Sequence, residues 1–91
     1  METIAMWLEM DQKNVRRALQ EAGEKLVGVQ EEIILDFSSV LRIDLGALQA
    51  IEEFTALAAG KGVKVVLRGV NVGVYKVLKL VKLASRFSFV N

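Results

Sequence analysis

Residues 35–51 read LDFSSVLRIDLGALQAI, and this stretch decides the fold. The apolar run that reaches Asp36 predicts a strand, which breaks at that residue. A short turn follows, and a helix starts at Asp44, whose carboxylate can accept a hydrogen bond from the first helical turn. The stretch therefore predicts a strand, a turn and a helix in succession, with Leu45 directly after the capping residue.

The length and composition restrict the class of protein. The 91 residues suit a single domain, residues 1–91, with room for one core and one modest site. No apolar run approaches the roughly 20 residues that span a bilayer, and Glu2 and Glu9 interrupt the N-terminus where a secretory signal needs an apolar stretch. We expect a cytoplasmic protein that is not integral to the membrane. The chain has no Cys and no His, so we expect no enzyme activity, no metal and no cofactor.

The hydrophobic period switches repeatedly along the chain, as in an α/β domain. Alternation at Ile4, Met6 and Leu8 predicts a strand, and Asp11 can cap the helix that follows it. Ile33, Ile34 and Leu35 suit a strand that is covered on both faces. The expected strands are residues 3–9, 32–37, 63–67 and 87–90, and the expected helices are residues 11–27, 45–59 and 72–83.

Four segments together resemble the STAS domain family, which includes the bacterial anti-sigma factor antagonists. They are Leu35-Asp36-Phe37-Ser38, Ile43-Asp44-Leu45-Gly46-Ala47-Leu48, Lys61-Gly62-Val63-Lys64-Val65-Val66-Leu67 and Val74-Tyr75-Lys76-Val77-Leu78-Lys79-Leu80. Their order and spacing make the resemblance specific, and it covers about residues 31–90. It implies a STAS-like α/β domain with a mixed sheet of about four strands and three main helices.

The first departure from the family is a shortened N-terminus. The family usually begins with a pair of strands, whereas this chain has room only for residues 3–9. An uncovered sheet edge commonly pairs with a second chain, and Trp7 is expected on the opposite face of that strand from Met6 and Leu8. We therefore expect a homodimer, or a docked partner, near Trp7. The alternative is that Trp7 packs under a helix.

The second departure is Leu45. In the antagonists this position carries a Ser or Thr whose phosphorylation by the partner kinase ejects the antagonist, and Leu45 has no hydroxyl. A phosphate there would place negative charge beside the helix N-terminus. Ser38 and Ser39, in the neighbouring strand-end loop, are the remaining candidate phosphorylation sites. The alternative for both is an ordinary turn serine that bonds the local backbone.

The expected docking surface is the loop before Asp44 and the first turns of its helix. The inward face of this helix would leave Leu45 and Leu48 on the other side, although Leu48 can instead pack under the loop. Gly46 would permit close approach by another chain. The inward residues are Ala47, Ala50, Ile51, Phe54, Leu57 and Ala58, and the candidate partner-binding residues are Ser38, Ser39, Asp44, Leu45, Gly46, Leu48 and Gln49.

The charges are segregated although the formal net charge is only +1. Every acidic residue lies at or before Glu53, and Lys76, Lys79 and Lys82 recur on the outer side of the last expected helix. Such a stripe suits an acidic partner, anionic lipid, nucleic acid or the acidic half of a second copy, or is simply a solvated face. We expect no nucleic acid, because the chain is not strongly basic and the stripe lacks interleaved aromatic residues.

Two shorter patterns have structural interpretations. Gly60-Lys61-Gly62 lacks the spacing of a P-loop and predicts a helix C-terminus. Asp36 and Asp44 are too few for a magnesium or calcium site.

The function implied by the resemblance is a non-enzymatic protein-interaction module that binds a kinase-like anti-sigma factor without a phosphorylation switch at Leu45. The alternative is a STAS subunit that supports an ABC ATPase in lipid or anion transport, a role that needs no phosphorylatable residue. A small-molecule-binding or catalytic outlier of the family is the third possibility.

Overall fold

The computed structural model describes residues 5–26 and 32–91. Strands and helices alternate in the predicted order. Residues 3–4, at the start of the first expected strand, and residue 27, at the end of the first expected helix, lie outside the described residues. The elements are β1 Ala5–Asp11, α1 Val15–Glu24, β2 Glu32–Ser39, α2 Leu45–Gly60, β3 Lys64–Arg68, α3 Val72–Leu80, the 3-10 helix η1 Ala84–Arg86 and β4 Ser88–Val90.

The four described strands form one sheet in the order β1-β2-β3-β4. Each neighbouring pair is parallel, so the α/β domain is confirmed, whereas a mixed sheet is wrong for the described strands. A helical connection returns the chain to the same end of the sheet before each new strand, which makes the strands parallel.

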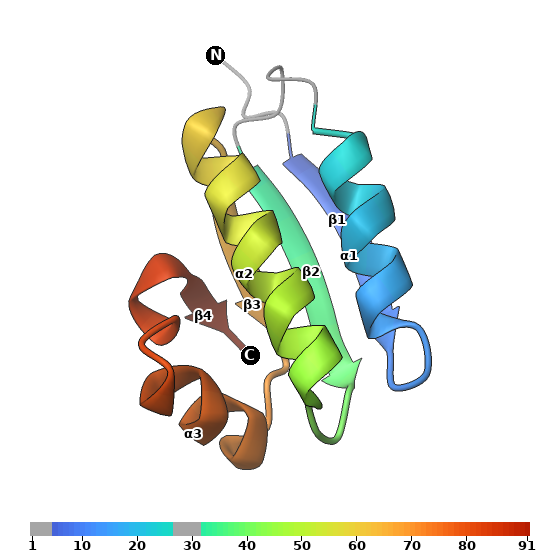
Figure 1. The fold of residues 1–91 in the computed structure, drawn as a ribbon, viewed down its shortest axis with the longest axis vertical. Coiled ribbons are helices and arrows are strands. Elements are labelled where there is room, and N and C mark those ends of the chain that lie inside the picture. The colour runs from blue at the N-terminus through green and yellow to red at the C-terminus, as the bar shows by residue number, and fades with distance from the viewer. Residues whose placement is uncertain (1–4, 27–31) are drawn as a thin grey trace.

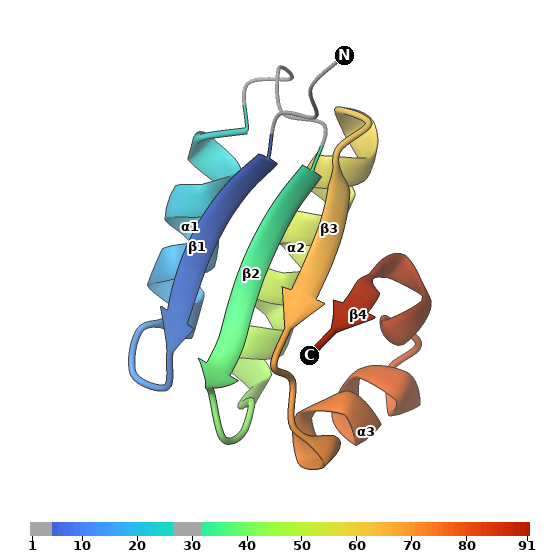
Figure 2. The ribbon, with the colours of Figure 1, turned by 180° about the vertical axis from the view of Figure 1, so that it is seen from behind.

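The layers of the molecule are visible in two opposite views. Helices α1 and α2 lie side by side on one face of the sheet (Figure 1). Seen from behind, β1, β2 and β3 have no described helix in front of them, and α3 lies past the end of β3 beside β4 (Figure 2). In the part of the chain that the structure describes, helices therefore cover only one face of β1, β2 and β3, which is unusual for parallel strands.

The core lies between this sheet and the two helices. Alternate residues of β2 face the helices, so Ile33, Leu35 and Phe37 are fully buried, and Phe54 of α2 packs in the same cluster. Burying one such side chain stabilises the fold by about 1.5–3 kcal/mol. Ile34 points to the open face and is only partly buried, so the strand is not fully covered on both faces as expected.

The N-terminal boundary of α1 differs from the prediction. Asn14, not Asp11, is the N-cap residue, and no side chain caps this helix. The Asp11 carboxylate instead accepts hydrogen bonds from the Lys13 backbone N–H (2.7 Å) and from Asn14 Nδ2 (3.3 Å). Asp11 therefore closes the turn that follows β1. The Asp11 carboxylate thus accepts hydrogen bonds from Lys13 and Asn14 of the turn, and the first turn of α1 has no side-chain cap.

Three further corrections concern β2, α2 and α3. Strand β2 continues through Asp36, so Ser38 and Ser39 are its last residues and not part of a loop. Leu57 of α2 is half exposed and lies over Gly23 of α1, whereas the rest of the predicted inward face is buried. Helix α3 ends at Leu80, three residues early, because the backbone turns left-handed shortly after it.

Two helices end in the same hydrogen-bonded motif. After α2, Gly62 has φ 68°, and the Val63 N–H donates to the Ala58 carbonyl oxygen (2.9 Å). This confirms the helix end predicted at residues 60–62. After α3, Lys82 has φ 63°, and the Leu83 N–H donates to the Leu78 carbonyl oxygen (2.9 Å). The second motif therefore places a lysine where glycine is normally preferred.

Candidate functional site

The loop between β2 and α2 is held from both sides. Gln12 Nε2 donates to the Arg42 carbonyl oxygen (2.9 Å), and Gln12 Oε1 accepts from the backbone N–H groups of Leu41 (2.6 Å) and Arg42 (3.0 Å). From the other side, Asn71 Nδ2 donates to the carbonyl oxygens of Val40 (3.3 Å) and Leu41 (3.0 Å). The loop is therefore ordered before any partner arrives. Its Leu41 side chain is 72% exposed.

Helix α2 begins as predicted. The Asp44 carboxylate accepts from the Ala47 backbone N–H (2.8 Å), which confirms Asp44 as the N-cap residue. Such a cap stabilises a helix by about 0.5–2 kcal/mol. Leu45 is 71% exposed and Gln49 is exposed, whereas Leu48 is partly buried against the core. For Leu48, the structure supports the packing alternative.

The start of α2 also lies close to α1. A Cβ atom at Gly46 would come within 3.8 Å of the Arg16 guanidinium. Beside this contact is a small hollow of about 60 Å³. It is lined by Gln12, Lys13, Val15, Arg16, Arg42, Asp44 and Ala47. The hollow is small beside the roughly 300–1,000 Å³ of typical ligand pockets.

The two candidate phosphoserines have different surroundings. The Ser38 hydroxyl and backbone N–H both donate to Asp36 Oδ1, at 2.5 and 2.9 Å. Gly69, with φ 71°, packs on Ser38 so closely that a Cβ atom there would lie 2.8 Å from the Ser38 Cβ. Ser39 is exposed at the end of β2. Of the two hydroxyls, that of Ser38 is committed to a buried carboxylate.

Asp36 is buried inside β2 and remains charged. Its pKa is lowered mainly by the Ser38 hydroxyl and backbone N–H; Arg68 lowers it further, against the opposing effect of burial. Arg68 Nη1 donates to Asp36 Oδ2 at 3.1 Å. This ion pair uses the carboxylate that was considered as a metal ligand. Within residues 5–26 and 32–91, no three acidic, His or Cys side chains cluster as a metal site.

Trp7 lies on the open face of the sheet, opposite to Met6 and Leu8, as predicted. It is 50% exposed, and the Arg68 guanidinium stacks over its ring at 5.2 Å from the ring centroid. Figure 2 shows no described helix over this part of β1, so the alternative that Trp7 packs under a helix is wrong for the described chain. β1 is also an edge strand of the described sheet.

The sequence prediction missed three residues of the site. Leu41 extends the exposed apolar surface, and Gln12 and Asn71 hold its loop. A polar residue at the start of one predicted helix, and an asparagine just before another, were the available signals. Their hydrogen bonds span about 30 residues of sequence, which a local pattern does not reveal.

Comparison with known proteins now identifies the family. A family model described as "Mlab, STAS domain" matches residues 9–90, so the chain belongs to the STAS domain family. No curated protein matches the sequence.

Solved structures share the fold at low sequence identity. A sulfate transporter family protein from Wolinella succinogenes has a TM-score of 0.78 and 19% identity, over 97% of this chain and 80% of that one. A candidate anti-sigma factor antagonist from Thermotoga maritima has a TM-score of 0.68 and 22% identity, over 92% of this chain and 73% of that one. The STAS domain of a SulP transporter from Vibrio cholerae has a TM-score of 0.72 and 17% identity, over 99% of this chain and 76% of that one.

STAS domains generally act as non-catalytic modules that mediate protein–protein interactions. Within the described part of the chain, no helix is long and apolar enough to cross a bilayer.

Proposed function

We propose that this protein is a non-enzymatic, cytoplasmic interaction module that docks a protein partner at the start of α2. The α2 docking surface comprises Ser38, Ser39, Leu41, Arg42, Asp44, Leu45, Gly46, Leu48 and Gln49. The observation that carries the proposal is the exposure of Leu41 and Leu45, each above 70%, on a loop that Gln12 holds in place. An ordered loop loses less conformational entropy on binding, and the two leucines supply apolar contact.

The first candidate partner is a kinase-like anti-sigma factor. The resemblance to the antagonists supports this choice, and Leu45 then makes binding independent of phosphorylation at that position. Ser39 is the better remaining phosphorylation candidate, because the Ser38 hydroxyl already donates to Asp36. A phosphate on Ser38 would also lie beside that negative charge.

The second candidate partner is an ABC ATPase of a lipid or anion transport system. The observation that favours it is Leu45 itself, which is exposed and lacks the hydroxyl that a phosphorylation switch requires. A constitutive subunit contact needs no such switch. The STAS domain of a transporter among the similar folds is compatible with this alternative.

A homodimer through the β1 edge is a separate proposal. Two observations support it: β1 is an edge strand among the described strands, and Trp7 on it is half exposed. Exposed strand edges tend to pair. Sedimentation velocity over a hundredfold concentration range tests it. A monomer throughout, or a dimer that Trp7→Ala does not weaken, would contradict it.

Affinity capture from the source organism's lysate tests the partner. Leu41→Asp and Leu45→Asp each place a charge in the apolar contact and should abolish capture, whereas Leu80→Asp, at another exposed leucine, should preserve it. Mass spectrometry of the captured protein distinguishes a kinase-like anti-sigma factor from an ABC ATPase. If Leu41→Asp and Leu45→Asp captured as much of the partner as Leu80→Asp, the α2 docking surface would be refuted.

A further inference from the structure

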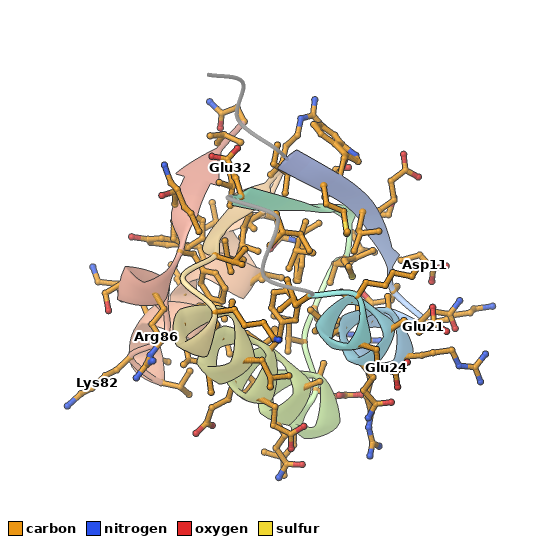
Figure 3. The ribbon with its side chains drawn as sticks, turned by 90° about the horizontal axis from the view of Figure 1, so that it is seen from above. Asp11, Glu21, Glu24, Glu32, Lys82 and Arg86 are labelled. Atoms are coloured by element: carbon orange, nitrogen blue, oxygen red, sulfur yellow. The ribbon has the colours of Figure 1, made fainter. Side chains whose placement is uncertain are left out.

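The outer side of α3 and the residues that follow it form a second exposed surface, which we call the α3 basic surface. It consists of Lys76, Lys79, Leu80, Val81, Lys82 and Arg86, and every one of them is exposed. No acidic residue follows Glu53 in the sequence. Figure 3 shows Lys82 and Arg86 on the side of the molecule away from Asp11, Glu21 and Glu24. The surface is therefore positive and lies apart from these acidic residues.

Leu80 is the apolar tip of this surface. Its exposed fraction, 82%, is the highest of the large hydrophobic side chains in the described chain. Lys76 and Lys79 line the same shallow hollow as Leu80, and Val81 beside it is 46% exposed. An exposed leucine flanked by lysines suits contact with a membrane interface, where lysine heads reach phosphates and an apolar side chain enters the acyl boundary.

Lys82 provides an independent observation. Its φ of 63° lies in the left-handed region, which is unfavourable for an L-residue, and glycine occupies the equivalent position after α2. The strained backbone places one more ammonium group beside Lys79, since both residues line one groove. Strain of this kind is more often found where a side chain serves a function.

We propose that the α3 basic surface binds the anionic surface of a phospholipid bilayer, with Leu80 inserted among the headgroups. Protein interfaces are depleted of lysine and enriched in arginine and aromatic residues, whereas this surface holds three lysines. Leu80 protrudes and would need a matching pocket on a protein partner, but lipid accepts it without one. The protein would bind at the surface of the bilayer, without any change in the fold.

The structure corrects one expectation about the same region. Tyr75 and Phe89 do lie beside Lys79 and Lys82, although the sequence stripe lacks aromatic residues. Their rings pack edge to face, with centroids 5.1 Å apart and an interplanar angle of 79°. They contact each other and do not form a row of open faces on which successive bases could stack. Lipid therefore remains a better occupant than single-stranded nucleic acid.

Vesicle co-sedimentation tests the proposal. The full chain is mixed with vesicles of phosphatidylcholine alone, or of phosphatidylcholine with about one third phosphatidylglycerol, in low and in high salt. We expect binding only to the anionic vesicles and loss of binding in high salt. Each lysine contributes about a fivefold gain in partitioning. Replacing Lys76, Lys79 and Lys82 together with Gln should therefore weaken binding about a hundredfold.

A matched variant controls for net charge. Lys13→Gln, Lys61→Gln and Lys64→Gln together remove the same charge from exposed positions outside the α3 basic surface, and should weaken binding far less. Leu80→Gln tests insertion and should weaken binding about tenfold, because it removes most of the transfer free energy of one leucine. Leu45→Asp, which should abolish partner capture, should bind vesicles normally. The two surfaces are thus tested separately, and the lipid proposal can fail while the α2 docking surface stands.

Three results would overturn the proposal. The first is the absence of binding to anionic vesicles in low salt, and the second is equal weakening by the two triple variants. The third is that the protein does not bind the vesicles but binds polyglutamate or a thymidine oligonucleotide, and that this binding depends on the three lysines. That result would assign the surface to an acidic protein or to nucleic acid, respectively.

Discussion

Replacing Lys82 with glycine should stabilise the protein. Lys82 is exposed and has φ 63°, so the substitution removes no buried contact. Relief of the left-handed conformation contributes about 1–2 kcal/mol, and the greater freedom of glycine in the unfolded chain offsets about 0.4–1 kcal/mol of it. The free energy of unfolding should rise by about 0.5–1 kcal/mol. For a domain of this size, the melting temperature should then rise by about 2–8 °C.

Two variants separate the backbone effect from the charge. Lys82→Gln keeps a Cβ atom in the left-handed conformation, so its stability should stay within about 0.5 kcal/mol of the wild type. Gly62→Lys makes the reverse change at the end of α2, where a Cβ atom would meet nothing within 4 Å, and should destabilise by a comparable amount. The assay is urea denaturation followed by circular dichroism. A Lys82→Gly protein no more stable than Lys82→Gln would refute the reasoning.

The remaining predictions concern the residues around the α2 docking surface. Gly69→Ala should destabilise the fold by about 2–4 kcal/mol, because Gly69 has a positive φ and its new Cβ would lie 2.8 Å from Ser38. Gly60→Ala is the control and should be neutral or stabilising, since its new Cβ would meet nothing within 4 Å. Equal urea midpoints for the two variants would argue against the close contact at Gly69. The folded pKa of Asp36 is lowered, so its carboxylate stabilises the fold at neutral pH, and this contribution is lost as the pH falls through that folded pKa. Asp36→Asn should accordingly lower stability at pH 7 but not in strong acid, and a difference from wild type that is independent of pH would count against it. Gln12→Ala should speed hydrogen exchange of the two loop amides that its side chain holds, and unchanged protection of these amides would show that the loop is ordered by other contacts.

The elements were predictable where the causes are local. The alternation in β1 and the period of α2 place apolar residues on one face, and the Asp44 cap acts on a backbone N–H only three residues away. These signals are contained in a short window of sequence. The helices and strands, their order and the exposure of Leu45 therefore followed from the sequence.

The errors arose where distant residues decide the local structure. Strand β2 passes through Asp36, which pairs with Glu9 of β1 and Arg68 of β3, 27 and 32 residues away. The end of α3 was missed because a lysine occupies the left-handed position that glycine usually signals. The ordering of Leu41 depends on Gln12 and Asn71, both of which are distant in sequence. The proposed docking surface keeps the predicted start of α2 and gains Leu41 from the loop before it.

The order of the strands in space, which equals their order in the chain, bears on how the protein is made. Trp7 pairs with Ile34, Ile34 with Val66, and Val66 with Ser88, so each new strand adds to the one synthesised just before it. No strand has to wait for a later one in order to find its neighbour. Assembly can therefore follow synthesis on the ribosome. The side of β3 that faces away from β2 is paired only when residues 88–90 have emerged, which makes β4 the last of the described strands to join the sheet.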